Sequence, residues 1–309
     1  MLLLGLALAL QARGEPDPGN QASRTAKEAV EKALPLIEKS ARVSLAERSC
    51  FTCHNHGMPY LALKAAGARG FKVDVDLPKS LLAHTEAALR RNRENYAKGK
   101  GAGGQADSAG WALWILAEGG WPADDTTKAV AHYLSVRDAD KGHWANVSVR
   151  PPTEASPFTT TFVALAGMKP YLDVPDRLDR ARAWLRESKP KDTEDRVFRL
   201  RALAYLGEDV KAAAKELLDT QRPDGGWAQM EGMESDAYAT ASALAALSEV
   251  NAKGVAWLVA AQKPDGSWHV KTRSKPFQPY FESGFPHAKD QFISVHASCW
   301  AVVALTRGN

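Results

Sequence analysis

Apolar residues recur every three to four positions along most of the chain, which predicts helices rather than strands. The predicted helices are of two kinds. One kind is amphipathic with a charged face, as in 79–100 and 176–189. The other is rich in small residues and apolar almost all round, as in 158–168 and 236–250. A helix without a polar face should be buried on all sides, so we expect inner helices of the second kind and outer helices of the first.

The two kinds alternate along the chain. The inner kind is predicted at six places, namely 51–69, 108–120, 158–168, 195–207, 236–250 and 293–306. Each has an amphipathic outer partner before it, beginning with 23–43. Such hairpins cannot bury their apolar faces alone, and six of them suffice to close a ring. We therefore predict an all-α fold, an (α/α)6 toroid of six helical hairpins that forms one domain over 23–309. An open solenoid of the same hairpins is the alternative, although no polar capping end is visible.

One short element repeats. The spacing Gln-x-x-x-Gly-x-Trp occurs at 221–227 and at 262–268, each time after an amphipathic helix and across a Pro-Asp-Gly turn. A weaker copy at 138–144 has Asp138 in place of the glutamine and keeps the glycine and the tryptophan. This element resembles the QW repeats of squalene-hopene cyclases and oxidosqualene cyclases. The resemblance implies a toroid with an apolar central cavity, in which the glutamine caps a neighbouring helix and the tryptophan packs across it.

The same resemblance implies one class of function, a terpenoid-cyclase-like or prenyltransferase-like enzyme or an isoprenoid-binding protein. Squalene cyclases carry two such toroids and an Asp-x-Asp-Asp motif, whereas this chain has room for one toroid and contains no such motif. The β-subunits of protein prenyltransferases share the toroid and hold zinc through Asp, Cys and His, and no matching trio aligns here. The pattern is compatible with an enzyme and with a protein that binds a ligand without catalysis. A non-catalytic module that presents loops to a partner protein or glycan is a further alternative.

The sharpest chemical signal is the sequence Cys-x-x-Cys-His at Cys50, Cys53 and His54. It resembles the haem-attachment sequence of c-type cytochromes. Two thiols about one helical turn apart reach the two vinyl groups on one haem edge, and the adjacent histidine then lies beneath the plane as an iron ligand. The resemblance implies thioether bonds from Cys50 and Cys53 and axial ligation by His54. We expect covalent haem c, and electron transfer or redox chemistry on a small apolar ligand in the cavity, with a redox partner protein.

Two other interpretations of the motif stay open. Cys50 and Cys53 could form a disulfide in an exported protein. Alternatively, the cofactor is zinc, held by the two cysteines with His54 or His56, although a second ligand pair at zinc-finger spacing is missing. For the haem, His296 is the preferred second iron ligand, because ring closure makes the last inner helix the neighbour of the first. A buried core histidine is the alternative role for His296.

The N-terminus and the charge distribution bear on the cellular location and on the classes of partner. Residues 1–14 contain a short apolar run followed by small residues, which is typical of a secretory signal, and 15–22 is predicted to be a linker. Attachment of haem c after export agrees with this, so we expect a periplasmic or secreted bacterial protein. The net charge of +4 is weak and the basic residues are scattered, which disfavours nucleic acid as a partner. We expect no membrane-spanning segment after the signal.

Overall fold

The computed structural model of the protein describes residues 25–276 and 279–308. The predicted signal segment 1–14 and the linker 15–22 lie outside the described residues. Within the described ranges, the regular structure is helical, and the β-structure consists of two isolated bridges. No helix in these ranges combines the length and the apolar character that crossing a bilayer requires.

The inner helices follow one another around a ring. They are α2 (Met58–Ala68), α5 (Gln105–Glu118), α7 (Pro157–Met168), α9 (Thr193–Tyr205), α11 (Ala237–Ala246) and α13 (Gln291–Leu305). The outer helices are α1 (Ala26–Glu47), α3 (Leu77–Arg90), α6 (Asp125–Val136), α8 (Pro175–Glu187), α10 (Lys211–Leu218) and α12 (Ala252–Ala260). A short helix α4 (Arg93–Ala97) continues α3 after a break at Arg91 and Asn92, where polar residues favour a turn. The predicted single outer helix 79–100 is therefore two helices.

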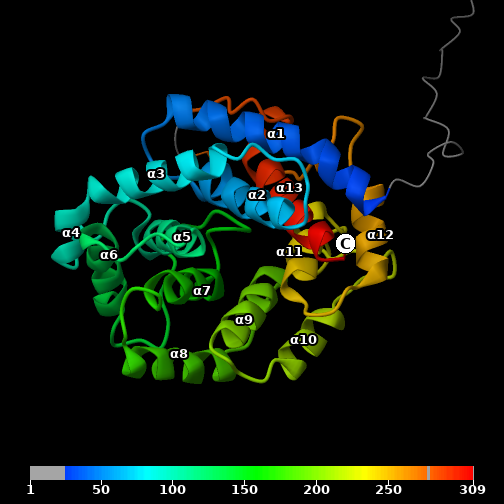
Figure 1. Ribbon diagram of the computed structural model, residues 1–309. Helices are drawn as coiled ribbons and strands as arrows, with labels where there is room; N and C mark the ends of the chain where they lie inside the picture. The colour runs from blue at the N-terminus through cyan, green and yellow to red at the C-terminus, as the bar shows by residue number, and fades with distance from the viewer. Residues whose placement is uncertain (1–24, 277–278, 309) are drawn as a thin grey trace, which may run out of the picture.

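The ring is closed (Figure 1). Each inner helix from α5 to α13 packs against the next, α13 packs against α2, and α2 contacts α5. The first outer helix α1 also contacts α12 and α13. The predicted all-α toroid is confirmed, and the alternative of an open solenoid is wrong, because the first and last hairpins bury their apolar faces against each other.

Small residues allow the inner helices to approach closely. A Cβ atom on Gly110 of α5 would lie 2.8 Å from the backbone nitrogen of Ala164 on α7. A Cβ atom on Gly167 would lie 2.9 Å from the carbonyl oxygen of Gly110. Any larger side chain at these two positions would push α5 and α7 apart, so the glycines set the spacing of this helix pair. Their role explains why the inner segments are rich in small residues.

The three tryptophans of the repeat element make the same contacts. All three are fully buried, and each indole Nε1 donates a hydrogen bond to the carbonyl oxygen of a leucine ten residues earlier. The pairs are Trp144 with Leu134, Trp227 with Leu217 and Trp268 with Leu258, at 2.7, 3.0 and 2.7 Å. Each tryptophan backbone N–H donates to a hydroxyl of the inner helix that follows, on Thr161, Thr240 and Ser298 respectively. The repeat thus ties the end of each of these outer helices to the next inner helix.

The two repeat glutamines act on neighbouring hairpins, in line with the capping role that the resemblance implies. Gln221 and Asn251 exchange two hydrogen bonds of 3.0 Å through their side-chain amides, and Asn251 is the N-cap of α12. Gln262 donates a 2.8 Å bond to the carbonyl oxygen of Ala29, in the first turn of α1. Each glutamine therefore holds the N-terminal end of the following outer helix in the ring.

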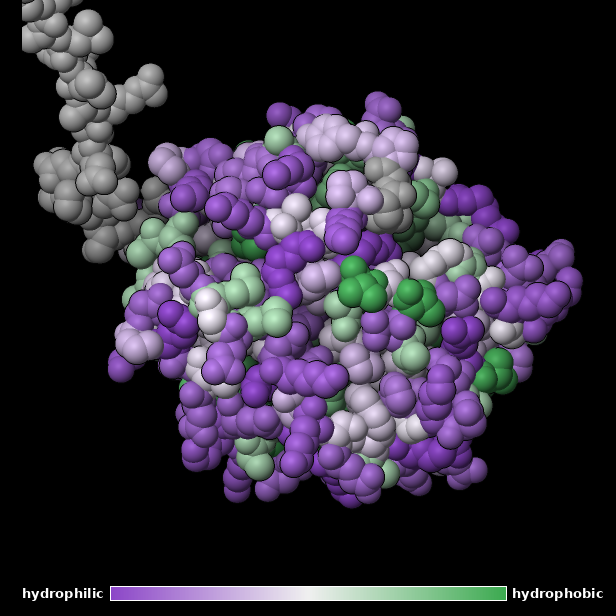
Figure 2. Space-filling model, turned by 180° about the vertical axis from the view of Figure 1, so that it is seen from behind, coloured by the Kyte–Doolittle hydropathy of each residue, from purple (hydrophilic) through white to green (hydrophobic). Residues whose placement is uncertain are grey.

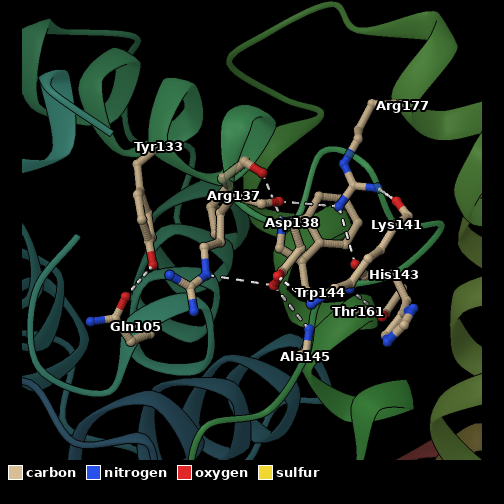
Figure 3. A network of polar contacts seen from close by, with 11 residues as sticks. Gln105, Tyr133, Arg137, Asp138, Lys141, His143, Trp144, Ala145, Thr161 and Arg177 are labelled. Carbon is tan, nitrogen blue, oxygen red and sulfur yellow. Dashed lines mark hydrogen bonds and ion pairs between the residues drawn. The ribbon is translucent and has the colours of Figure 1, made fainter. Parts of the chain in front are cut away.

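The third copy, with Asp138 in place of glutamine, is held differently (Figure 3). Asp138 accepts a 3.2 Å hydrogen bond from the backbone nitrogen of Ala145, within the same loop. The contact with the next hairpin comes instead from Arg177 of α8, whose guanidinium lies 3.7 Å from the ring centroid of Trp144 and donates to three carbonyl oxygens of the loop 137–143. A bridge between neighbouring hairpins is therefore present at this copy too, but its hydrogen-bond donor is an arginine of the next outer helix instead of a glutamine.

Candidate functional site

A cavity opens where the first and last inner helices meet. Its volume is about 440 Å³, within the range of small-molecule sites. Its lining comes from the segment before α2, from 150–154, from 272–276 with 279–280, and from the first turns of α13. We call this cavity the mouth pocket. Its walls include Phe292 and Ile293 together with several prolines, and its polar groups include His54 and His296.

His54 lies at the start of the short π-helical segment Cys53–Gly57, which leads into α2. Its ring faces the mouth pocket, with its centroid 5.0 Å from that of Phe292 on α13. Burial, together with the charges of Arg150 and Arg48, lowers the pKa of His54 to about 4. The imidazole is therefore neutral near neutral pH, which is the form that binds metal ions.

The two cysteines of the motif differ in exposure. Cys50 is exposed and Cys53 is buried, and both are free thiols, so the disulfide alternative is not what this structure contains. The Cys53 sulfur lies 3.9 Å from Nδ1 of His54. Burial raises the pKa of Cys53 well above its ordinary value, so its thiol stays protonated. A buried, protonated thiol is a weak nucleophile.

His296 reaches the same pocket from α13. Its side chain is 1% exposed, and its ring packs edge-on against those of Trp111 and Tyr238 at 5.8 and 5.4 Å. Its Nε2 is buried and has no hydrogen-bond partner among the residues that the structure describes. Burial and the nearby His54 lower the pKa of His296 to about 3. Buried polar atoms are nearly always paired, so a lone imidazole nitrogen beside a cavity is a candidate ligand atom. The structure thus brings His54 and His296 to one pocket, although 241 residues separate them along the chain.

The arrangement does not support the zinc alternative. Both ring nitrogens of His56 are engaged, one with the hydroxyl of Ser44 and the other with the backbone nitrogen of Thr52, each at 3.0 Å. Among residues 25–276 and 279–308, no group of three or more His, Cys, Asp or Glu side chains is placed to hold a metal ion. Structural zinc sites use four protein ligands and catalytic sites three.

These residues fit a haem better than they fit zinc. Two free thiols precede a neutral imidazole that lines a cavity, and a second imidazole with an unpartnered nitrogen lines the same cavity. The walls between them are largely apolar, as a porphyrin face requires. Cys50 and Cys53 are not among the residues that line the mouth pocket, whereas His54 and His296 are the two imidazoles there that would ligate a haem iron.

Sequence reasoning missed a buried acid on α9. Glu194 is 4% exposed and accepts hydrogen bonds from Thr159 at 2.8 Å and from Tyr238 at 3.0 Å. Burial raises its pKa well above the ordinary value, and no salt bridge compensates it among the described residues. Tyr238 connects it to His296, against which the tyrosine ring packs. The only signal in the sequence was a carboxylate in the first turn of an inner helix, which a helix N-terminus explains by itself.

A second feature that sequence reasoning missed lies inside the ring. The guanidinium of Arg201, on α9, sits among three aromatic rings, 4.9 Å from Trp300, 5.0 Å from Phe162 and 5.7 Å from Trp114. Burial and the charge of Arg307 lower the pKa of Arg201 to about 10, which leaves it charged near neutral pH. This cluster of rings from three inner helices therefore holds a resident cation.

Comparisons with known proteins bear on the fold. No protein-family model matches the chain, and no curated protein matches it. Among solved structures, a variant of the type II terpene cyclase MstE from Scytonema, in complex with its substrate geranylgeranyl dihydroxybenzoate, is similar with a TM-score of 0.56 and 15% identity, covering 91% of this chain and 99% of that one. A protein from Actinoplanes is similar with a TM-score of 0.56 and 16% identity, covering 90% and 100%. At these identities the similarity establishes the architecture, a toroid like that of type II terpene cyclases.

Proposed function

We propose that the mouth pocket is the functional site, and that this protein is a c-type haem protein built on a terpene-cyclase-like toroid. It would serve electron transfer or a redox reaction on a small apolar ligand. One observation carries the proposal: His54 of the Cys-x-x-Cys-His motif and His296, with its unpartnered buried nitrogen, line a single cavity of about 440 Å³. The Cys-x-x-Cys-His motif lies within one short segment of the sequence, whereas His296 comes from the last inner helix.

The residues of the chain would divide the work of holding the cofactor. Cys50 and Cys53 would form the thioether bonds, and His54 and His296 would be the iron ligands, both neutral because their pKa values lie at about 4 and about 3. When bound, haem supplies one-electron chemistry at its iron. Phe292 and Ile293 would cover the macrocycle and exclude water from it. Low exposure of the iron to water is one of the ways in which a protein sets a haem potential.

The test is to produce the protein in cells with a c-type haem-attachment system and to measure its intact mass and its pyridine-haemochrome spectrum. We expect a mass increase of one haem and a Soret band. Cys53→Ala should lose the full covalent attachment, whereas Cys299→Ala, which removes the third cysteine of the chain, should keep it. The bare polypeptide mass from haem-competent cells would overturn the proposal.

The terpene-cyclase-like fold favours a second candidate, an isoprenoid-binding protein or cyclase-like enzyme. The MstE structure contains a geranylgeranyl substrate, and burial raises the pKa of the Glu194 carboxyl well above its ordinary value. Two observations weigh against cyclisation. Arg201 already occupies the aromatic cage that would stabilise a cationic intermediate, and the sequence contains no Asp-x-Asp-Asp motif.

This candidate has its own test. Binding of geranylgeraniol and related alcohols should quench tryptophan fluorescence, and Phe292→Trp in the pocket wall should enlarge the signal. Conversion of a geranylgeranyl substrate to a cyclic product, abolished in Glu194→Gln, would establish the cyclase. Absence of both binding and conversion would remove this candidate without affecting the haem proposal.

A module that only presents a surface to a partner finds less support. It requires a contiguous apolar patch outside the ring. On the face shown in Figure 2, hydrophilic side chains predominate and the hydrophobic ones are scattered.

A further inference from the structure

The mouth pocket is asymmetric in charge. Lys275 and Lys289 line it and are exposed to solvent, and Arg150 lines it with a half-buried side chain. Neither lysine forms a salt bridge with an acid in the part of the chain that the structure describes. The one carboxylate in the lining, Glu154, is paired with Arg150. The outer part of the pocket thus carries an excess of positive charge.

The inner part of the pocket has a different character. Phe292 and Ile293 of α13 form part of the wall, and the imidazoles of His54 and His296 also line it. The pocket therefore presents an apolar wall behind a cationic rim.

A further cation lies beside the mouth pocket. Arg48 is itself near the rim, with its guanidinium 4.3 Å from the ring centroid of Phe281, next to the pocket residue Tyr280. Arg48 therefore adds to the positive charge around the rim.

We propose that the ligand of the mouth pocket is an amphipathic carboxylate, with its apolar body against Phe292 and Ile293 and its carboxylate held by Lys275, Lys289 and Arg150. This inference deepens the proposed function and rests on it only in taking the mouth pocket as the functional site. Two ligand classes share this chemistry, a haem with its two propionates and an isoprenoid acid. In both, the cations at the rim define the orientation in which the ligand enters.

The experiment compares carboxylic acids with their methyl esters. The probes are protoporphyrin IX and its dimethyl ester, and farnesoic acid and its methyl ester, added to the full chain made without a haem-attachment system. Circular dichroism first verifies that this protein is helical. Binding is followed by tryptophan quenching. We expect one of the two acids to bind about tenfold more tightly than its ester at low salt, and the preference to shrink as salt screens the exposed lysines.

A matched pair of double variants tests the residues. Lys275→Ala/Lys289→Ala should bind acid and ester about equally, whereas Lys128→Ala/Lys211→Ala, which removes two exposed lysines from outer helices, should keep the preference. In haem-loaded protein, the first double variant should also raise the pH at which the propionates titrate, measured by NMR. That second measurement does not depend on how the haem-free chain folds.

Each outcome separates this inference from the haem proposal. If the protein prefers the acid over its ester but never acquires haem, the result supports the carboxylate site and contradicts the haem proposal. A preference for the isoprenoid acid then identifies the ligand class. Covalent haem without any effect of Lys275 and Lys289 supports the haem and overturns the inference. Equal binding of acid and ester also overturns it. So does the absence of any binding, when the Lys275→Ala/Lys289→Ala variant also leaves the propionate titration unchanged.

Discussion

Gln262 joins the two ends of the ring: its side-chain nitrogen donates a 2.8 Å hydrogen bond to the carbonyl oxygen of Ala29. The two residues are 233 positions apart, and the glutamine is 7% exposed. The other repeat glutamine, Gln221, bonds to Asn251 in the next hairpin along the chain, 30 residues away. The same sequence element therefore makes a local contact once and closes the toroid once.

Gln262→Ala should lower the free energy of unfolding by about 1 to 3 kcal/mol, because buried partners lose their hydrogen bonds. It should also speed amide hydrogen exchange in α1 (26–47), which loses its tie to the last hairpins. Urea unfolding and native-state hydrogen exchange measure the two effects. Gln221→Ala is the control, with a similar loss of stability and no faster exchange in α1. Equal exchange of α1 in both variants would contradict a closing role for Gln262.

His296 should make stability fall in mild acid. Its pKa is 6.5 in the unfolded chain and about 3 in the folded one, so between these values the unfolded state binds more protons. The contribution is therefore intact above pH 6.5 and is lost as the pH falls towards 3. Within that window His296→Gln should reduce the slope of stability against pH by about 1.4 kcal/mol per pH unit. Urea unfolding at several pH values measures it, with the exposed His132→Gln as control; identical slopes in all three proteins would refute the prediction.

Glu194 should have the opposite pH dependence. Its folded pKa lies well above the unfolded 4.5, so its contribution is full below pH 4.5 and is lost as the pH rises towards the folded value. Glu194→Gln keeps the shape of the neutral acid and removes this loss, so the variant should be at least as stable as the wild type at neutral pH. Glu194→Ala should be less stable by about 1 to 3 kcal/mol, because the hydroxyls of Thr159 and Tyr238 lose their acceptor.

Thermal unfolding of the Glu194 variants between acidic and neutral pH is the measurement. The exposed Glu231→Gln serves as the control and should leave the pH profile unchanged. A Glu194→Gln protein that is much less stable than wild type at neutral pH would mean that the native carboxylate is ionised.

Substitutions of Arg201 test whether its cation–π contacts stabilise the protein. Its guanidinium is partly buried among aromatic rings and forms no salt bridge within the described residues, so Arg201→Met, which retains an apolar stem of similar reach, should be neutral or stabilising. Arg201→Ala should cost about 2 to 4 kcal/mol through the cavity it leaves. Added guanidinium at low concentration should recover part of that loss by occupying the cage. Calorimetric melting measures all three effects, and Arg222→Met on the surface is the control. A loss of several kcal/mol in Arg201→Met would show that the cation–π contacts outweigh the desolvation of the charge.

The local features of the fold were readable in the sequence. The contrast between segments such as 158–168, apolar all round, and 176–189, with a charged face, predicted inner and outer helices because side-chain periodicity reports burial directly. The repeat at 221–227 and 262–268 predicted the type of contact that Trp227 and Trp268 make. Closure of the ring followed from the number of hairpins. These properties depend on neighbours within one or two helical turns, or on an element that recurs.

The amino-acid order by itself determined the helices and their inner or outer placement, and the trio Cys50, Cys53 and His54 carried the prediction of haem attachment. Only the tertiary structure decided that His54 shares a cavity with His296, that Glu194 is buried without a salt bridge among the described residues, and that Arg201 lies among three aromatic rings. The physical reason is that burial without a partner is a property of a side chain's surroundings. Those surroundings are assembled from helices that lie from 35 residues apart, for Glu194 and Thr159, to more than two hundred apart, for His54 and His296, which no local periodicity records.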